Sequence, residues 1–209
     1  MAGRNKWRTS RDVRPTTGLI GPNAILQLLP VLEGACGIDR TAYMMQRAGL
    51  GGPPAETGMI PEGDAARLHQ QLRRQEPSLA ASVSAEAGRR TADYILANRI
   101  PMPAQWVLKL LPPQPAAKVL SRAIDRHAWT FAGSGLFRVV DPWTFEITGN
   151  PLIRGEHSAD CLCHWHAAVF ARLFQVLVAP NIQCREVQCG ACCADRACRF
   201  ELRQHRQVA

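Results

Sequence analysis

The chain has 209 residues, of which 46% are hydrophobic, and a formal net charge of +8 at pH 7. It contains no apolar run of about 18 residues, the length that a transmembrane helix requires, and the basic start MAGRNKWRTSRDVRP lacks the apolar stretch of a signal peptide. Length and composition are those of an ordinary globular protein with a sizeable core. We expect a cytoplasmic protein with at most peripheral membrane contact.

The positive charge is suited to an anionic partner, which could be nucleic acid, an anionic membrane surface or a small molecule bearing carboxylates. Charge alone does not choose among these partners, and a merely solvated basic surface is an equal alternative. The reducing cytoplasm also bears on the eight cysteines, because clustered cysteines in that compartment are more often metal ligands or redox groups than disulfides.

The first part of the chain predicts helices. Residues 1–18 are rich in Arg, Lys, Thr and Pro without periodicity, which is typical of a flexible segment. Apolar residues then recur at helical spacing from Ile25 to Leu32, and Gly34 with Gly37 supplies a stop. Further helices are expected over residues 40–48, 64–77, 78–98 with Ser78 as cap, within 100–115, and over 116–129. The last of these places His127 on its apolar face, seven residues after Leu120.

The second part of the chain predicts strands around one helix. LFRVV and TFEI flank a DPW turn and are typical of a hairpin. A helix capped by Asp160 is expected from Cys161 or Cys163 to Val178, followed by two more strands. The predicted fold is α+β, with N-terminal helices and an antiparallel sheet of about four strands packed against helices. We divide the chain into a flexible start (1–18), a helical part (19–132), a continuous sheet-and-helix part (133–203) and a tail (204–209).

A carboxylate and three thiols predict a metal site in this second part. Glu186 shares a strand face with the apolar Ile182, where an unpaired carboxylate is costly. Cys189 in the next turn, Cys198 on the returning strand and Cys163 at a helix start offer thiolates, and the helix start favours the thiolate form of Cys163. A closed set of three Cys and one Glu suits a structural tetrahedral zinc.

Spare thiols leave alternatives open. Cys161, Cys192 and Cys193 could each replace one of the named ligands. The spacing Cys189-Gly-Ala-Cys192 is also compatible with a redox pair or with half of an iron–sulfur site. The cysteines could also be unligated and structural.

The pattern Cys163, Glu186-x2-Cys189, Cys198-x-Phe200 resembles the V4R (4-vinyl reductase) domain family, which is related to Bet3-type subunits of TRAPP vesicle-tethering complexes and to sensor domains of phenol-responsive regulators. The equivalent residues of those sensors hold zinc, which implies zinc on the same four positions here. The turn between Cys189 and Cys198 departs from the sensor spacing by about one residue, which keeps Cys192 or Cys193 as a stand-in for Cys189.

The segments TADYILANRIP, AQWVLKLLP and AIDRHAWTFAGSGLF resemble the BchJ family of bacteriochlorophyll biosynthesis proteins, described as vinyl reductases of the tetrapyrrole ring. The resemblance runs from about residue 18 to residue 202. A reductase needs a hydride or electron source, and the sequence offers no G-x-G-x-x-G after a strand. We therefore favour a carrier or accessory factor that binds a tetrapyrrole of the magnesium protoporphyrin or protochlorophyllide type. An 8-vinyl reductase and a non-catalytic scaffold are the alternatives.

The stretch HAWTFAGSGLF supplies candidate ligand contacts for a flat apolar ring. We expect His127, Trp129, Phe131 and Phe137 to line a cavity, with His127 as axial ligand of a central magnesium; core packing is the competing role for each. The expected partners are the magnesium tetrapyrrole, magnesium chelatase or another enzyme of the pathway, and a second copy of the chain through the apolar helix 169–178. Nucleic-acid binding is not expected, because no aromatic is interleaved on the polar face that carries Arg185, Arg196, Arg199 and Arg203.

Overall fold

Residues 18–192 and 196–204 are described from a computed structural model of the chain. The predicted flexible start lies outside these ranges except for its last residue, and the predicted tail lies outside them except for its first. Cys193, considered above as a substitute ligand, also lies outside the described residues.

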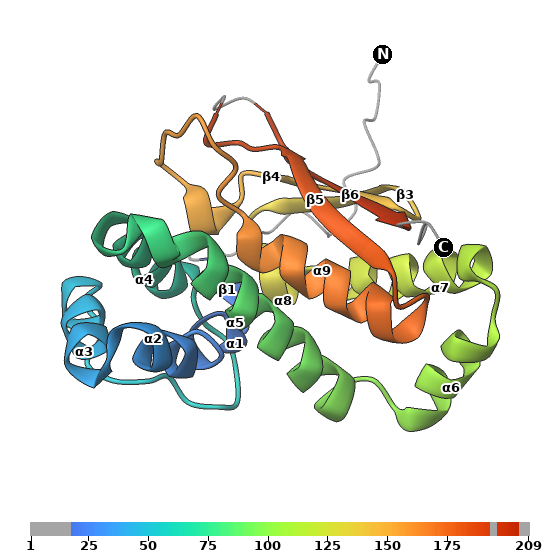
Figure 1. Ribbon diagram of the computed structural model, residues 1–209, viewed down its shortest axis with the longest axis horizontal. Helices are drawn as coiled ribbons and strands as arrows, with labels where there is room; N and C mark the ends of the chain where they lie inside the picture. Colours follow the sequence, from blue (N-terminus) through green and yellow to red (C-terminus); the bar gives the residue numbers. More distant parts are fainter. Residues whose placement is uncertain (1–17, 193–195, 205–209) are drawn as a thin grey trace, which may run out of the picture.

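Helices make up the N-terminal part of the chain (Figure 1). They are α1 (Asn23–Leu26), α2 (Leu29–Cys36), α3 (Ile38–Arg47), α4 (Glu62–Gln75), α5 (Pro77–Asn98), α6 (Met102–Leu110), α7 (Pro113–Arg126) and α8 (Trp129–Ala132). Two short strands, β1 (Leu19–Ile20) and β2 (Ile60–Pro61), pair antiparallel in this part. The sequence did not predict this pair, because two residues are too few to show the alternation of a strand.

Prolines explain two differences from the predicted helices. The stretch from Ile25 to Leu32 was predicted as one helix but belongs to both α1 and α2, with Pro30 in the first turn of α2. A proline has no N–H to donate to the residue four before it, so the helical ladder cannot run through this position. Pro77 opens α5, which places Ser78 inside the helix rather than at its cap. A proline is tolerated there because the first N–H groups of a helix have no partner within the helix.

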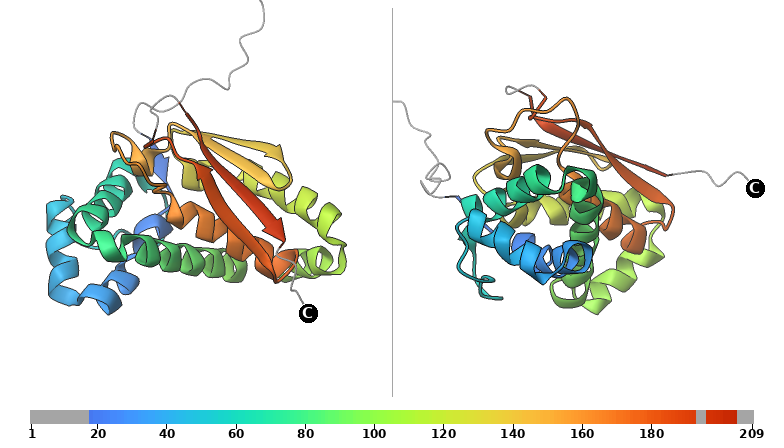
Figure 2. Two further views of the ribbon diagram at one scale, coloured as in Figure 1. Left: turned by 45° about the horizontal axis from the view of Figure 1, so that its top comes forward. Right: turned by 60° about the vertical axis from the view of Figure 1, so that its left-hand side comes forward.

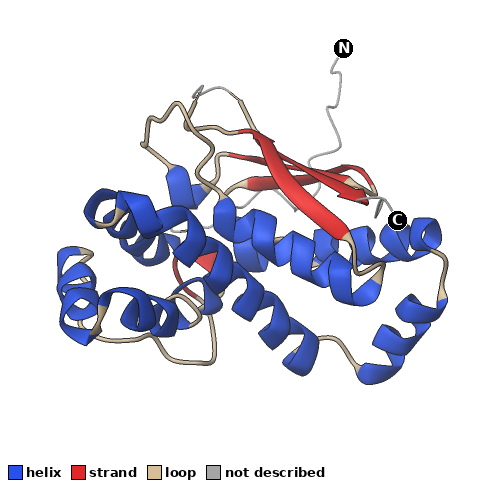
Figure 3. Ribbon diagram, viewed as in Figure 1, coloured by secondary structure: helices blue, strands red, loops and turns tan. Residues whose placement is uncertain are grey.

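The C-terminal part forms the second layer of the fold. Strands β3 (Leu136–Asp141), β4 (Thr144–Thr148), β5 (Ile182–Gln188) and β6 (Cys198–Gln204) form an antiparallel sheet in the order β3-β4-β6-β5. Between β4 and β5 the chain forms the 3-10 turn η1 (Pro151–Ile153) and helix α9 (His164–Leu177). The helices lie against one face of the sheet (Figure 3), so the predicted α+β class with a four-stranded antiparallel sheet is confirmed.

Helix α9 lies between α5 and the sheet (Figure 2). Gly88 allows α5 to approach closely, because a Cβ atom at this position would lie 2.4 Å from the carbonyl oxygen of Trp165. The indole N–H of Trp165 donates to the hydroxyl of Thr91 over 3.2 Å. The apolar side of α9 is therefore part of the core, including Val169 and Leu177, and is not available as the interface between two copies for which the sequence suggested it.

The sheet covers α9 with its inward side chains. Phe145 and Phe200 pack edge-to-face on Phe170 of α9, with ring centroids 5.1 and 5.3 Å apart. Cys198, Phe200 and Leu202 are all buried, which confirms the predicted alternation of β6. Among the described residues, no helix combines the length and the apolar character that crossing a bilayer demands.

Candidate metal centre

The end of β5, the start of β6 and the start of α9 meet at one end of the sheet. Cys163 is the residue directly before α9, Glu186 lies on β5, Cys189 follows the end of β5, and Cys198 is the first residue of β6. One ligand atom from each of the four lies within 4.8 Å of the others. The structure thus brings together the four residues that the sequence singled out, and this Cys/Glu cluster could hold a metal ion.

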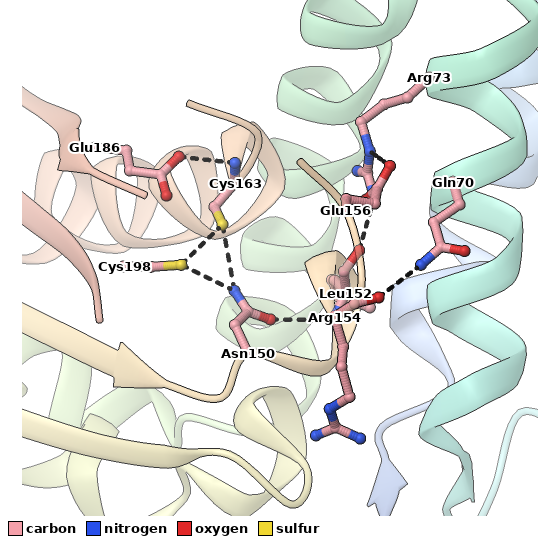
Figure 4. Close-up of polar contacts among 9 residues, drawn as sticks. All are labelled: Gln70, Arg73, Asn150, Leu152, Arg154, Glu156, Cys163, Glu186 and Cys198. Atoms are coloured by element: carbon pink, nitrogen blue, oxygen red, sulfur yellow. Dashed lines mark hydrogen bonds and ion pairs between the residues drawn. The ribbon is translucent and has the colours of Figure 1, made fainter. Parts of the chain in front are cut away.

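The geometry of the cluster fits a small cation (Figure 4). The Sγ atoms of Cys163 and Cys198 are 3.4 Å apart, near the spacing of about 3.8 Å that Zn–S bonds of about 2.3 Å give in a tetrahedral site. The Oε2 atom of Glu186 accepts the backbone N–H of Cys163 over 2.7 Å. Its Oε1 atom is buried and has no hydrogen-bond partner among the described residues. A cation between the thiols would supply the partner that this oxygen lacks.

The protonation of the cluster also calls for a cation. Burial, and then the negative charge of Cys189, raise the pKa of Glu186 to about 8. Hydrogen bonds from the thiols of Cys163 and Cys198 lower the pKa of Cys189, so one thiolate is shared by three sulfurs. Burial raises the pKa of Cys163 well above its ordinary value. The chain by itself cannot keep all four groups ionised, whereas a divalent cation favours the ionised form of each.

Two expectations about the start of α9 are wrong. Asp160 is not the cap of the helix, because Cys163 occupies that position and α9 begins at His164. The helix start was expected to favour the thiolate form of Cys163, but desolvation outweighs the helix dipole at a side chain that is 3% exposed. Hydrogen bonds from the backbone of Leu162 and Ala191 help to lower the pKa of Cys189, so the thiolate form is favoured there more than at Cys163.

The side-chain amide of Asn150 contacts two of the sulfurs, and the sequence did not predict this contact. Its side-chain N–H group lies 3.3 Å from Sγ of Cys163 and 3.9 Å from Sγ of Cys198. Its Oδ1 atom accepts the backbone N–H of Leu152 and thereby caps η1. N–H donors to thiolates orient metal ligands. The only sequence signal was the turn pattern Gly-Asn-Pro, which does not show where the amide points.

An ion pair from α4 fixes the loop that leads to Cys163. Arg73 forms a salt bridge with Glu156 and donates to the carbonyl oxygen of Leu152 over 2.6 Å (Figure 4). Both charged side chains are largely buried, at 11% and 12% exposure. The helical part of the chain therefore anchors the turn from which Asn150 reaches the cluster.

Two of the considered substitute ligands, Cys161 and Cys192, lie in the described part of the chain but outside the group of four. Burial raises the pKa of Cys161 to about 11, and that thiol stays outside the group of four. The thiol of Cys192 is exposed and lies 3.6 Å from the carbonyl oxygen of Ala159. The compact arrangement of donors thus selects Cys189 over Cys161 and Cys192.

The predicted ligand residues fall into two pairs. His127 is exposed at the end of α7, so its predicted place on the apolar face is wrong: α7 ends at Arg126, and the chain turns before the i+7 position is reached. Trp129 is 56% exposed at the start of α8. Phe131 and Phe137 instead pack against each other in the core, with ring centroids 5.1 Å apart.

Two grooves on the surface have volumes of 380 and 260 Å³. The larger is lined by residues of α4 and by Arg154, and the smaller lies beside the metal cluster and reaches Asn150 and Cys198. None of the four predicted ligand residues lines either groove. The predicted aromatic cavity is therefore not formed at these two places.

Two buried histidines were not among the predicted site residues. His69 lies close to the carbonyl oxygen of Ala24, with Nε2 at 3.0 Å, and His166 lies close to that of Phe131, at 3.2 Å. Burial lowers the pKa of His69 to about 3 and that of His166 to about 4, so both imidazoles are neutral. The sequence does not reveal which residues a histidine within a helix will contact.

Comparison with known proteins identifies the fold and the family. The V4R domain family matches residues 143–204, which include all four residues of the metal cluster. The fold resembles that of an H-NOX protein from K. algicida in its unliganded Fe(II) form, with a TM-score of 0.57 and 9% identity over 91% of this chain and 99% of that one. An H-NOX structure solved to probe heme distortion gives a TM-score of 0.54, with 8% identity over 91% of this chain and 97% of that chain.

Two relatives are much more similar in sequence. The bacteriochlorophyll synthase 23 kDa chain of Cereibacter sphaeroides is 51% identical over 203 residues, which cover 93% of this chain and 97% of the relative. The protein of the same name from Rhodobacter capsulatus is 44% identical over 174 residues, covering 82% and 81%. The chain therefore belongs to the family of the bacteriochlorophyll synthase 23 kDa chains, bacteriochlorophyll biosynthesis proteins, and carries a V4R domain.

Proposed function

We propose that the chain binds a magnesium tetrapyrrole of the protoporphyrin or protochlorophyllide type and acts as its carrier or accessory factor in bacteriochlorophyll biosynthesis. The likeness in fold to an H-NOX protein studied for heme distortion is the main support. A heme is itself a flat metallated tetrapyrrole, and the likeness extends over 91% of this chain. A scaffold of this kind is therefore compatible with a ligand of this shape.

The exposed end of α7 offers the contacts for such a ring. The Nδ1 atom of His127 lies 2.8 Å from the carbonyl oxygen of Ala123, so the tautomer that donates this hydrogen bond leaves the Nε2 lone pair unprotonated. Histidines that bind metals commonly fix their second nitrogen in this way. Trp129 adds an exposed aromatic surface two residues further on. A site at the surface suits a carrier, because the ligand must leave for another protein.

A spectroscopic titration tests this proposal. Purified chain is titrated with magnesium protoporphyrin, and a shifted Soret band with saturable binding is expected. Trp129→Ala should weaken binding about tenfold if the indole stacks on the ring. Trp106→Ala is the matched control, because this second exposed indole lies on a different helix and its loss should leave binding unchanged.

The same samples separate the carrier from its alternatives. Incubation of a divinyl substrate with the protein and NADPH or a reduced flavin should leave the 8-vinyl group intact. Turnover of that group would show a reductase and overturn the carrier role. A failure to bind any tetrapyrrole of the pathway would leave the chain as a scaffold of the biosynthetic machinery.

We also propose that the metal of the cluster is zinc and that its role is structural. Three thiolates and one carboxylate fill a tetrahedral shell, and all three sulfurs are at most 3% exposed, so the donor set has no open position for a substrate. Bound there, zinc would tie the β5–β6 hairpin to the start of α9. Elemental analysis of protein purified without added metal should give about one zinc per chain. A brown, iron-rich sample would indicate an iron–sulfur centre instead.

The carrier role implies a recipient, which we propose is another enzyme of the pathway such as magnesium chelatase, and we also propose that the chain forms a homodimer. Light scattering on the purified protein, alone and mixed with the chelatase subunits, measures both associations. A monomer that forms no complex with or without bound tetrapyrrole would contradict these partners.

A further inference from the structure

Helix α6 exposes four large apolar side chains to the solvent. Met102, Trp106, Val107 and Leu110 are 57%, 62%, 57% and 86% exposed. The residues that α6 buries are Gln105 and Leu108, which face the rest of the chain. The amide of Gln105 is used to bond the carbonyl oxygens of Leu96 and Ile100, so even the buried polar group has a structural task.

The four exposed side chains share one face of the helix. Met102, Trp106 and Leu110 follow one another at intervals of four residues, and Val107 lies beside them. The inward residues lie on the opposite face. Figure 1 shows α6 at the edge of the molecule, joined to α5 and α7 by short connections. An outward apolar face on a projecting helix is a contact surface for another apolar phase.

The charged side chains of α6 and of the chain on either side of it have a single sign. Residues 99–124 contain four cationic side chains and no acidic one. The four are Arg99, Lys109, Lys118 and Arg122, all exposed, and none forms a salt bridge with an acidic residue in the part of the chain that the structure describes. A surface of negative charge would complement this segment, and the apolar face of α6 would enter the layer beneath that charge.

We propose that α6 docks on an anionic lipid bilayer surface, lying in the interface with Met102, Trp106, Val107 and Leu110 inserted among the lipids. Tryptophan favours the boundary between headgroups and acyl chains, and short amphipathic helices with cationic flanks bind there without crossing the bilayer. A second copy of the chain is a poorer occupant, because a stable protein interface needs about 800 Å² on each partner and draws on about 20 residues. Helix α6 has nine residues, four of them apolar and well exposed.

This docking does not depend on tetrapyrrole binding, and the two are tested separately. The full chain is mixed with vesicles of phosphatidylcholine alone or of phosphatidylcholine with phosphatidylglycerol, and co-sedimentation is measured. We expect binding to the anionic vesicles that weakens with salt and is at least about tenfold weaker on neutral ones. Trp106→Ser should reduce binding to the anionic vesicles about tenfold, whereas Trp129→Ser, which removes an equally exposed indole elsewhere, should change it less than about twofold.

Both variants remove exposed side chains and are therefore expected to fold. Unchanged circular dichroism and metal content will verify that they do. Equal binding by Trp106→Ser and the wild type would overturn the proposal. So would a wild type that does not co-sediment with anionic vesicles. A third result would overturn it in favour of an interface between copies. In that case light scattering would show a dimer for the wild type and a monomer for Trp106→Ser, without vesicle binding by either.

Discussion

The metal cluster and the two exposed tryptophans of α6 and α8 differ in where their side chains find contacts. Cys163, Cys189 and Cys198 are buried, and their contacts come from other parts of the same chain. Trp106 and Trp129 are more than half exposed. A buried cluster of acidic groups must be neutralised inside the protein, whereas an exposed indole gains most from a second molecule. This difference is the basis for proposing a structural role for the first region and contact with ligand or lipid for the second.

The largest effect should come from breaking the buried region. Cys198→Ser replaces a sulfur that lies 3.4 Å from Sγ of Cys163 and removes one of the four proposed metal ligands. We expect loss of stoichiometric zinc and at least about 3 kcal/mol of stability, because a structural metal contributes its binding energy to folding. Denaturant unfolding and elemental analysis measure both. Cys36→Ser, in the half-buried thiol of α2, is the control and should keep its zinc. Full stability of Cys198→Ser would show that the cluster is unligated.

The packing beneath the metal cluster is tested at Gly88. An added Cβ would meet the carbonyl oxygen of Trp165 at 2.4 Å, and backbone cannot move away cheaply. Gly88→Ala should therefore destabilise the fold by about 1–3 kcal/mol despite the better helix propensity of alanine. Gly34→Ala in α2 meets no atom within 4 Å and should stabilise by about 0.5–1 kcal/mol. Thermal unfolding measures the pair, and the same sign of change in both would contradict the close approach of α5 to α9.

A variant of Asn150 tests whether a neighbouring hydrogen-bond donor supports metal binding by the cluster. Asn150→Ala removes the N–H donor that lies 3.3 Å from Sγ of Cys163, and with it the cap of η1. Loss of a group that hydrogen-bonds a metal ligand weakens metal affinity about 10- to 100-fold. Competition with a zinc chelator measures the affinity. Asn98→Ala, an exposed amide on α5, serves as the control. Wild-type affinity in Asn150→Ala would mean that the amide supports only the turn.

A smaller effect depends on pH. Burial, and then the charge of Arg73, lower the pKa of His69 to about 3, whereas an unfolded histidine titrates near 6.5. The folded state therefore binds fewer protons, and stability falls as the pH drops below about 6.5, by about 1.4 kcal/mol per unit for each such group. His69→Gln keeps a donor for Ala24 but cannot titrate. Its unfolding free energy should fall less steeply between about pH 6.5 and 5 than that of the wild type. Parallel curves would contradict a neutral His69.

The strand patterns predicted the metal cluster because a period of two leaves few choices. Once Phe200 and Leu202 face inward, Cys198 must do so as well, and Glu186 follows Ile182 in the same way. Asn150 could not be found, since a turn sequence does not tell toward which element its amide points. The four residues of the cluster could be named from residue type and spacing, but the groups that support them come from backbone and loops.

The helical surface was harder to predict, and His127 shows why. The i+7 pattern from Leu120 holds only while the helix continues, and α7 stops one residue before the histidine. The outward apolar face of α6 was also hidden, because periodicity tells which residues share a face but not whether that face meets the core. Only the packing of Gln105 and Leu108 decides the orientation of this helix.

The most direct test of tetrapyrrole binding at the exposed end of α7 compares two ligands on one variant. His127→Ala and the wild type are titrated with magnesium protoporphyrin and with metal-free protoporphyrin, and zinc is measured in the same samples. We expect an affinity about tenfold lower for the magnesium form, little change for the metal-free form, and unchanged zinc, because the exposed His127 lies outside the metal cluster. Equal losses for the two ligands, or no loss for either, would contradict an axial contact from His127.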